Sequence, residues 1–201
     1  MTAQQDKKAF TQWTKSSISY KNYQDFIDKK SERFELSLID LLYISNFKGG
    51  NSTINEPETT IDNKLTKYSK ILVEIKDKFS GKDLEHLSDN EINELTILVT
   101  SICNLTHKTT LTKIDGFSVS YLSALLNSYF PKLVPILDRR VLINLSLVKL
   151  TDIDKYGQIK NIQRFYDPLM KKFAELSKKE QLSIREIDKY LFTTKLILPT
   201  D

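Results

Sequence analysis

The spacing of the apolar residues is the feature that most limits what this chain can fold into. Over most of its 201 residues, apolar side chains recur every three or four positions, the period of a helix with one face in a core. The chain has only five glycines and five prolines, too few for short strands joined by many turns. No segment alternates strands with helices, and no internal repeat is found. The sequence therefore predicts an all-α fold.

The start and stop signals of helices divide the chain into eight segments. The segment 32–47 is expected to be buried on nearly all sides and to end at Gly49-Gly50, and residues 51–58 form a polar loop. Ser88 with Glu91 and Ser183 with Glu186 form capping boxes. The predicted helices cover residues 20–30, 32–47, 59–79, 88–106, 122–129, 138–147, 155–177 and 183–195.

Composition excludes several classes of protein. The chain is 40% apolar and 28% charged, an ordinary globular balance. No run approaches the ~18 apolar residues of a membrane span, and the first residues lack the apolar core of a signal peptide, so a cytoplasmic protein is expected. The single cysteine, Cys103, excludes an internal disulfide and a cysteine-rich metal site, and we expect no metal.

The charge is distributed unevenly along the chain. Residues 1–100 carry 14 basic and 16 acidic side chains, a balance of −2, whereas residues 101–201 carry 16 and 10, a balance of +6. A basic second half is typical of a protein that binds a phosphate-bearing partner, although a solvated lysine face explains it almost as well.

The segment 111–147 carries the most information about function. A short turn holds Lys113 and Gly116, and Ser118 and Ser120 stand at the start of the following helix. Backbone N–H groups at a helix N-terminus lack partners within the helix and lie at the positive end of its dipole, so such a turn can hold a phosphate. Similar turns also occur as purely structural corners of α-proteins.

The sequence LTKIDGFSVSYLSALL, followed by PKLVPILDRRVLINL, resembles the helix-hairpin-helix DNA glycosylase superfamily. The shared pattern is a Leu-x-x-Ile-x-Gly hairpin, a helix, an extended Pro-hydrophobic-hydrophobic-Asp and a further helix. The resemblance implies that Asp138 is the catalytic carboxylate. It also implies that the hairpin at Gly116 grips a phosphate of duplex DNA, often with a monovalent cation bound there, and that no other cofactor is required.

Two departures from the family pattern bear on the activity. Ser118 replaces the second hairpin glycine, which normally permits the closest approach of the backbone to a phosphate. Ser120 stands where members that also cleave the DNA strand carry a lysine. The resemblance therefore implies a monofunctional glycosylase without lyase activity.

Asp138 has a chemical and a structural interpretation. Cleavage of an N-glycosidic bond develops positive charge on the sugar, which an ionised carboxylate stabilises. The alternative is that Asp138 only caps the helix that follows it. An Asp138 that faces an open polar cleft favours the enzyme, and one that lies against its own helix N-terminus favours the cap. Arg139 and Arg140 are expected to contact DNA phosphates, or else to solvate a surface.

The end of the segment 32–47 is where the resemblance places the residues that surround a flipped base. Tyr43, Asn46, Phe47 and Asn51 are the candidates for this pocket or for the wedge that fills the gap in the duplex. Core aromatic residues and a helix C-cap are the alternative.

The combined prediction is a monomeric, two-lobed helical bundle that removes a damaged or modified base from DNA. Residues 34–106 form a helical lobe, residues 107–147 carry the hairpin and Asp138, and residues 148–201 form C-terminal helices that pack with the N-terminal ones. A non-catalytic helix-hairpin-helix DNA-binding module is the rival interpretation, and a helical protein-interaction domain is a third. The sequence does not indicate which base is removed, or whether the role is repair or defence against modified foreign DNA.

Overall fold

The computed structural model describes residues 5–50 and 53–196, and within these residues it is built from helices without a β-strand. The all-α prediction is confirmed. Three short 3-10 helices, η1 (Leu84–His86), η2 (Leu150–Asp152) and η3 (Ile162–Phe165), accompany the α-helices. The α-helices are α1 (Lys7–Lys29), α2 (Leu38–Phe47), α3 (Glu58–Phe79), α4 (Asp89–Asn104), α5 (Val119–Tyr129), α6 (Arg139–Asn144), α7 (Tyr166–Glu180) and α8 (Ile184–Thr193).

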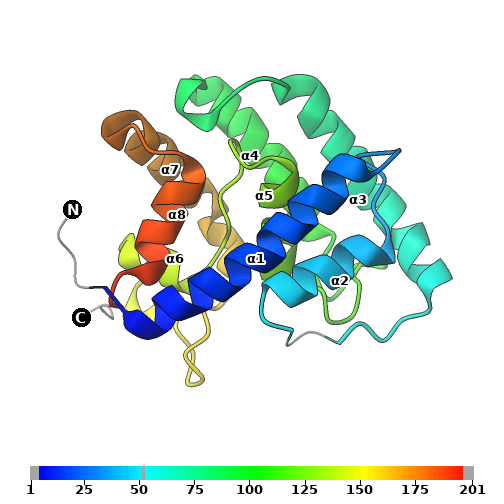
Figure 1. The fold of residues 1–201 in the computed structure, drawn as a ribbon, viewed down its shortest axis with the longest axis horizontal. Coiled ribbons are helices and arrows are strands. Elements are labelled where there is room, and N and C mark those ends of the chain that lie inside the picture. Colours follow the sequence, from blue (N-terminus) through cyan, green and yellow to red (C-terminus); the bar gives the residue numbers. More distant parts are fainter. Residues whose placement is uncertain (1–4, 51–52, 197–201) are drawn as a thin grey trace.

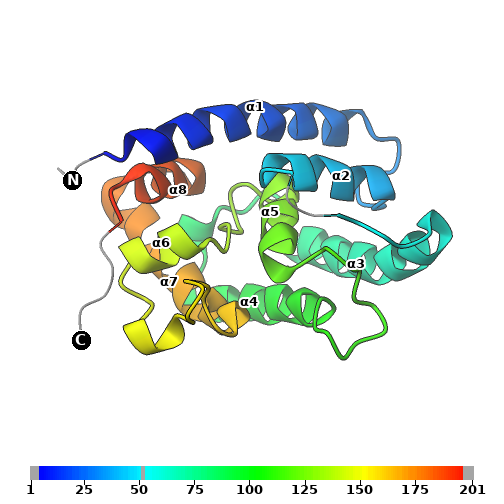
Figure 2. The same cartoon turned by 90° about the horizontal axis from the view of Figure 1, so that it is seen from below.

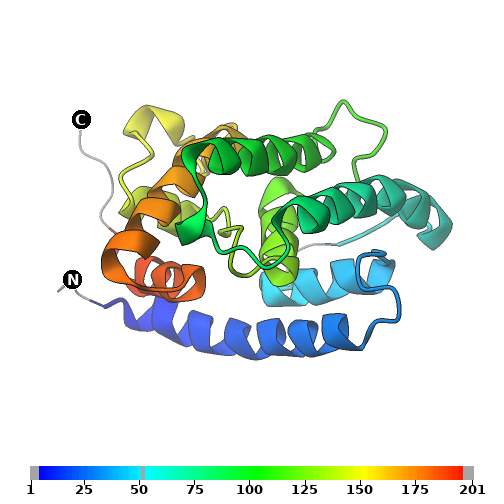
Figure 3. The same ribbon diagram turned by 90° about the horizontal axis from the view of Figure 1, so that it is seen from above.

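Helix α5 lies in the middle of the molecule, and every residue from Leu122 to Tyr129 is buried. The long helix α1 runs along one side, with α2 and α8 packed against it at different points along its length (Figures 1 and 2). Helices α3 and α4 lie next to each other on the side opposite α1 (Figure 3). The helices thus share one continuous hydrophobic core around α5.

Several predicted helices begin at different residues from those observed, α1 and α2 among them. Helix α1 starts at Lys7, because the Asp6 carboxylate accepts hydrogen bonds from the backbone N–H groups of Lys8 and Ala9. Helix α2 starts at Leu38 instead of residue 32, because Ser37 and Asp40 form a capping box there. The Gly49-Gly50 stop is confirmed, since α2 ends at Phe47 and both glycines have positive φ.

The prediction that the segment 32–47 is buried on nearly all sides is wrong. Ile39 and Leu42 are 49% and 53% exposed, so only one face of α2 enters the core. The helix predicted from residue 155 begins only at Tyr166, because Gly157 and Asn161 adopt positive φ and turn the chain. None of the helices in the part of the chain that the structure describes combines the length and apolar character of a membrane span.

A fully buried carboxylate connects three helices. The Asp40 side chain is 0% exposed and accepts hydrogen bonds from the hydroxyls of Tyr23 and Tyr129, each at 2.8 Å. Its second oxygen is 2.9 Å from Lys30 Nζ and accepts the backbone N–H of Ser37 at 2.8 Å. Burial, with the adjacent carboxylate, raises the pKa of Tyr23 well above its ordinary value, so the hydroxyl stays a donor. Asp40 therefore joins α2 to α1 and α5.

We expect Asp40→Ala to lower the free energy of unfolding by about 3–5 kcal/mol, because it leaves the Lys30 ammonium without its buried partner. Urea unfolding followed by circular dichroism measures this. The control is Asp28→Ala, which removes an exposed ion pair with Arg33 and should change stability by about 1 kcal/mol or less. Equal effects of the two substitutions would contradict the role given to Asp40.

Candidate functional site

Asp138 lies at the junction between the extended segment after α5 and the start of α6. Its Oδ1 accepts the backbone N–H of Arg140 at 2.8 Å and so caps α6. Its Oδ2 lies 3.2 Å from Nζ of Lys48, the residue that follows α2. The two side chains are 19% and 16% exposed, respectively. One oxygen therefore has a structural role, while the other is part of an ion pair between distant segments.

The ion pair lies in the wall of a cavity of about 140 Å³, which we call the Asp138 cavity. Its walls come from α1, from the end of α2, from the segment before α6, and from α8. Helices α2 and α8 both lie along α1 (Figure 2). The walls combine aromatic and charged groups; the lining residues are Gln12, Trp13, Ser16, Phe47, Lys48, Ile136, Asp138, Arg185, Asp188 and Phe192. Asp138 thus caps its own helix and also faces a polar, aromatic-lined cavity.

A second ion pair lies in the same cavity. Arg185 Nη1 is 2.7 Å from Asp188 Oδ2, and the Asp188 side chain is 4% exposed. Burial raises the pKa of Asp188 to about 6, although the charges of Arg185 and Lys48 oppose this shift, and the nearby Asp138 carboxylate adds to it. The cavity therefore holds two carboxyl groups in different environments, a condition that suits acid and base chemistry.

The predicted hairpin lies in the connection between α4 and α5. Gly116 has φ of 79°, a conformation that glycine adopts without strain. A pocket of about 520 Å³ beside it is lined in part by Ser118 and by the basic side chains Lys108 and Lys113. The Ser120 hydroxyl donates to the carbonyl of Leu137 at 3.3 Å, which attaches the start of α5 to the residue before Asp138.

One contact at the hairpin competes with a phosphate. The Glu56 carboxylate accepts the backbone N–H of Asp115 at 2.6 Å and also pairs with Lys64. Lys64 Nζ in turn donates to the carbonyl of Lys113 at 2.6 Å, so the hairpin is attached to α3. Lys113 itself pairs with Asp115 at 2.9 Å. The Asp115 amide is therefore already occupied by an acceptor from within the protein.

The two arginines after Asp138 make contacts inside the protein. Arg139 is exposed and donates to the carbonyl of Gly157 at 2.5 Å. Arg140 donates to the Phe192 carbonyl at 2.9 Å and pairs with Asp6 at 2.8 Å. Arg140 therefore holds both ends of the described chain against α6, whereas Arg139 keeps an exposed side chain available to a partner.

The residues predicted for the base pocket fall in different places. Phe47 lines the Asp138 cavity. Tyr43 stacks against Tyr23 and Phe26, with ring centroids 5.4 and 5.0 Å apart, and so belongs to the packing between α1 and α2. Asn46 is exposed and donates to the Ser19 hydroxyl at 3.0 Å. Asn51 lies outside the described residues.

The sequence reasoning missed several residues of the cavity, among them Trp13, Arg185 and Asp188. A signal exists for the last two, because Arg185 and Asp188 are three residues apart and so lie on one face of a helix. Nothing local marks Trp13, whereas Lys48 directly follows Phe47, one of the predicted pocket residues. Their contribution arises from contacts between segments far apart in the chain.

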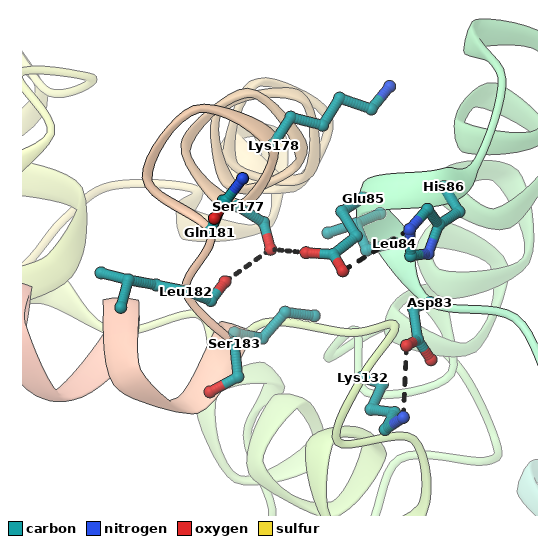
Figure 4. Close-up of a pocket in the computed structure, with 11 residues that line it drawn as sticks. Asp83, Leu84, Glu85, His86, Lys132, Ser177, Lys178, Gln181, Leu182 and Ser183 are labelled. Atoms are coloured by element: carbon teal, nitrogen blue, oxygen red, sulfur yellow. Dashed lines mark hydrogen bonds and ion pairs between the residues drawn. The ribbon is translucent and has the colours of Figure 1, made fainter.

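A larger pocket of about 550 Å³ lies between η1 and the end of α7 (Figure 4). Asp83, Glu85 and His86 gather there closely enough to ligate a metal ion. Each carboxylate has a partner, since Asp83 is 3.2 Å from Lys132 Nζ and Glu85 accepts the Ser177 hydroxyl at 2.6 Å (Figure 4). These contacts hold η1 against its neighbours, and no feature of the pocket indicates a ligand.

No family model matches the chain, and no curated protein or solved structure matches it. The resemblance to helix-hairpin-helix glycosylases therefore stays a prediction. The assignment of the Asp138 cavity as the candidate functional site rests on the geometry and chemistry of its residues.

We expect the stability advantage of the wild type over Asp188→Asn to decrease as the pH rises from about 4 to 6. The folded protein keeps a proton on Asp188 that the unfolded chain has already lost, so the contribution of this carboxyl falls through that window. The change is on the order of 3 kcal/mol and is measured by denaturant unfolding at each pH.

Glu186→Gln, on the same helix, is the control for this pH series. Contacts with Ser183 lower the pKa of Glu186, so the wild type should gain on this variant as the pH rises. A difference for Asp188→Asn that is flat, or that follows Glu186→Gln, would contradict the assignment.

Proposed function

We propose that the chain is a monofunctional DNA glycosylase that hydrolyses the N-glycosidic bond of a damaged or modified base, with Asp138 as its catalytic carboxylate. The observation that carries this proposal is that Asp138 lies in the wall of an aromatic-lined cavity and that its Oδ2 is paired with Lys48. A residue that served only as a helix cap would need neither the cavity nor the ion pair.

The arrangement suits a reaction that passes through a cationic sugar. A carboxylate that is fixed in advance stabilises an oxocarbenium-like transition state more strongly than water does, because no reorganisation is needed when charge develops. The Arg140 amide and the Lys48 ammonium hold the Asp138 side chain from two sides. The carboxylate can also position the attacking water.

The aromatic walls suit a base that has left the duplex. Enzymes that act on bases extrude the nucleotide and stack its base between aromatic or apolar side chains. Trp13, Phe47 and Phe192 provide such surfaces in the Asp138 cavity. In the proposed complex, the hairpin at Gly116 holds a phosphate near the first turn of α5. The +6 balance of the second half favours this orientation.

Lys48 bears on the proposed absence of lyase activity. A Schiff base requires an unprotonated amine directed at the sugar. The ammonium of Lys48 is ion-paired with Asp138, so it serves as a partner of the carboxylate and not as a nucleophile. The product is then an intact strand with an abasic site.

One observation favours the rival function, a non-catalytic DNA-binding module. The hydrogen bond from the Arg140 amide to Asp138 is an ordinary N-cap contact, and a cap alone accounts for one of the two oxygens. If the chain is such a binding module, the cavity is a gap in the packing without a ligand, and the hairpin alone contacts DNA.

We expect Asp138→Asn to lower base release by about 100-fold or more, because it removes the charge that opposes the developing cation. DNA binding should be retained, since asparagine keeps the cap. The measurement is free base released from a panel of natural and modified DNAs, scored by mass spectrometry, with strand breaks scored on gels before and after alkali.

Asp152→Asn is the matched control, since Asp152 also accepts a backbone N–H, from Lys149, and pairs with an arginine, Arg164, but does not line the Asp138 cavity. It should leave base release unchanged. Full activity of Asp138→Asn, or no base release by the wild type from any DNA, would show that the catalytic assignment is wrong. Strand breaks without alkali would contradict the absence of lyase activity.

We expect duplex DNA affinity to fall with salt and Gly116→Ala to weaken it. Each phosphate neutralised on B-DNA contributes about −0.9 to the slope of log affinity against log salt. Alanine is strained at a φ of 79°, so the hairpin must change shape. Gly81→Ala is the control, because Gly81 has a similar φ of 73° but lies in the turn after α3. Equal effects of the two variants on affinity, measured by fluorescence anisotropy, would contradict the hairpin's role.

A further inference from the structure

The connection between η2 and η3 carries an aromatic side chain in solvent. Tyr156 is 74% exposed, more than any other aromatic residue that the structure describes. The connection projects beyond the helices as a narrow gold loop (Figure 1). The ring of Tyr156 is therefore not part of the core, and the fold alone does not explain its position.

The turn that presents this ring is held in one shape. The Asp154 carboxylate accepts the backbone N–H groups of Tyr156 and Gln158 at 2.8 and 2.9 Å. The backbone N–H of Asp154 donates to the carbonyl of Gln158 at 2.8 Å, and that of Gly157 donates to the carbonyl of Asp154 at 2.9 Å. A turn that is ordered before binding loses little conformational entropy when its side chain contacts a partner.

The turn is attached to the candidate site. Arg139, the residue directly after Asp138, donates through Nη1 to the carbonyl of Gly157 at 2.5 Å. The same connection reaches the predicted hairpin, because Ile159 lines the pocket beside Gly116. The turn thus contacts the start of α6, and the residues that follow it contribute to the hairpin pocket. A partner that covers both places also covers the turn.

The surface around the ring is basic. Residues 154–160 carry two lysines, both exposed, and one acidic side chain, Asp154, whose carboxylate is bound by the backbone of the turn. Lys155 Nζ lies 5.0 Å from the ring centroid of Tyr156, and the exposed Arg139 side chain lies against the turn. Basic side chains around an exposed aromatic ring are the combination that binds unpaired bases and their phosphates. The charge therefore favours a nucleic acid as the partner.

We propose that Tyr156 enters the DNA duplex at the position that the flipped nucleotide has left, and that its ring stacks on the neighbouring bases. Lys155 and Arg139 contact the flanking phosphates. The proposal rests on the proposed function and deepens it, because it assigns the residue that holds the duplex open. A side chain inserted between base steps replaces part of the stacking that is lost there. The wedge then comes from the connection between η2 and η3 and not from the end of α2.

The test compares two DNA duplexes of one sequence. One is intact, and the other carries a tetrahydrofuran residue, a stable abasic analogue, in place of one nucleotide. The abasic duplex already contains the gap, so a side chain can fill it without the cost of flipping a base. We expect the wild type to bind the abasic duplex about tenfold or more tightly than the intact one, because stacking on one base allows a factor of this size. Fluorescence anisotropy at one salt concentration measures both affinities.

Tyr156→Ala should remove the preference for the abasic duplex, because it removes the ring. Tyr156→Phe should keep the preference, since phenylalanine retains the ring and lacks only the hydroxyl. Ile97→Ala is the matched control, because Ile97 is also a large exposed side chain, at 68%, but lies on α4. It should keep the full preference. Circular dichroism confirms that each variant is folded.

Three results overturn the inference. The first is equal affinity of the wild type for the two duplexes. The second is a preference that persists in Tyr156→Ala. The third is a preference that is lost to the same extent in Tyr156→Phe or in Ile97→Ala, because the ring of Tyr156 is then not its cause.

The outcome is distinguishable from that of the proposed function, since this binding measurement needs no base release. A preference for the abasic duplex that depends on the Tyr156 ring, without base release from any DNA, supports the stacking role and contradicts the glycosylase. Base release by a wild type that binds the two duplexes equally supports the glycosylase and contradicts the stacking role.

Discussion

The arrangement of the candidate site depends on the buried carboxylate of Asp40. This group joins α2 to α1 and α5 through two tyrosine hydroxyls and the Lys30 ammonium. A buried charge is tolerated only when its hydrogen-bonding capacity is met, so the three helices can adopt few relative positions. Helix α1 carries Trp13 and α2 ends next to Lys48, and both reach the Asp138 cavity. The polar contacts around Asp40 therefore set the position of one side of that cavity.

A second polar contact sets the other side. Arg140, in the first turn of α6, binds Asp6 before α1 and the carbonyls of Phe192 and Thr194 at the end of α8. The planar guanidinium presents several donors in fixed directions, so it can hold two chain segments at once. Trp13 and Phe192 then meet with ring centroids 5.7 Å apart. The cavity thus lies between two polar attachments, each of which joins parts of the chain more than 80 residues apart.

The cavity concentrates four charged groups in a small volume. Lys48 pairs with Asp138 and Arg185 pairs with Asp188, so the formal charges balance. The two carboxylates differ in burial: Asp188 is almost completely buried, whereas Asp138 is partly exposed to solvent. Burial raises the pKa of Asp188, and unlike surroundings are how neighbouring acids acquire distinct roles in enzymes. This difference in burial, within one small cavity, distinguishes it from ordinary packing.

The sequence by itself determined the helical class, because the period of the apolar residues and the scarcity of glycine and proline are local properties. It also located the stop of α2 at Gly49-Gly50 and the starts of α4 and α8 at their capping boxes, since these signals act over three or four residues. The start of α2 was predicted wrongly because two local signals compete there. The apolar period suggests a helix from residue 32, but the capping box of Ser37 and Asp40 starts the helix at Leu38.

Asp138 was identified from the sequence, but the residues that surround it were not. Lys48 is 90 residues from Asp138 in the chain, Arg185 and Asp188 are about 50 residues from it, and Trp13 is more than 120. Only the packing of α1, α2 and α8 brings these residues together around Asp138. Contacts of this kind depend on how whole helices pack, which no short stretch of sequence encodes.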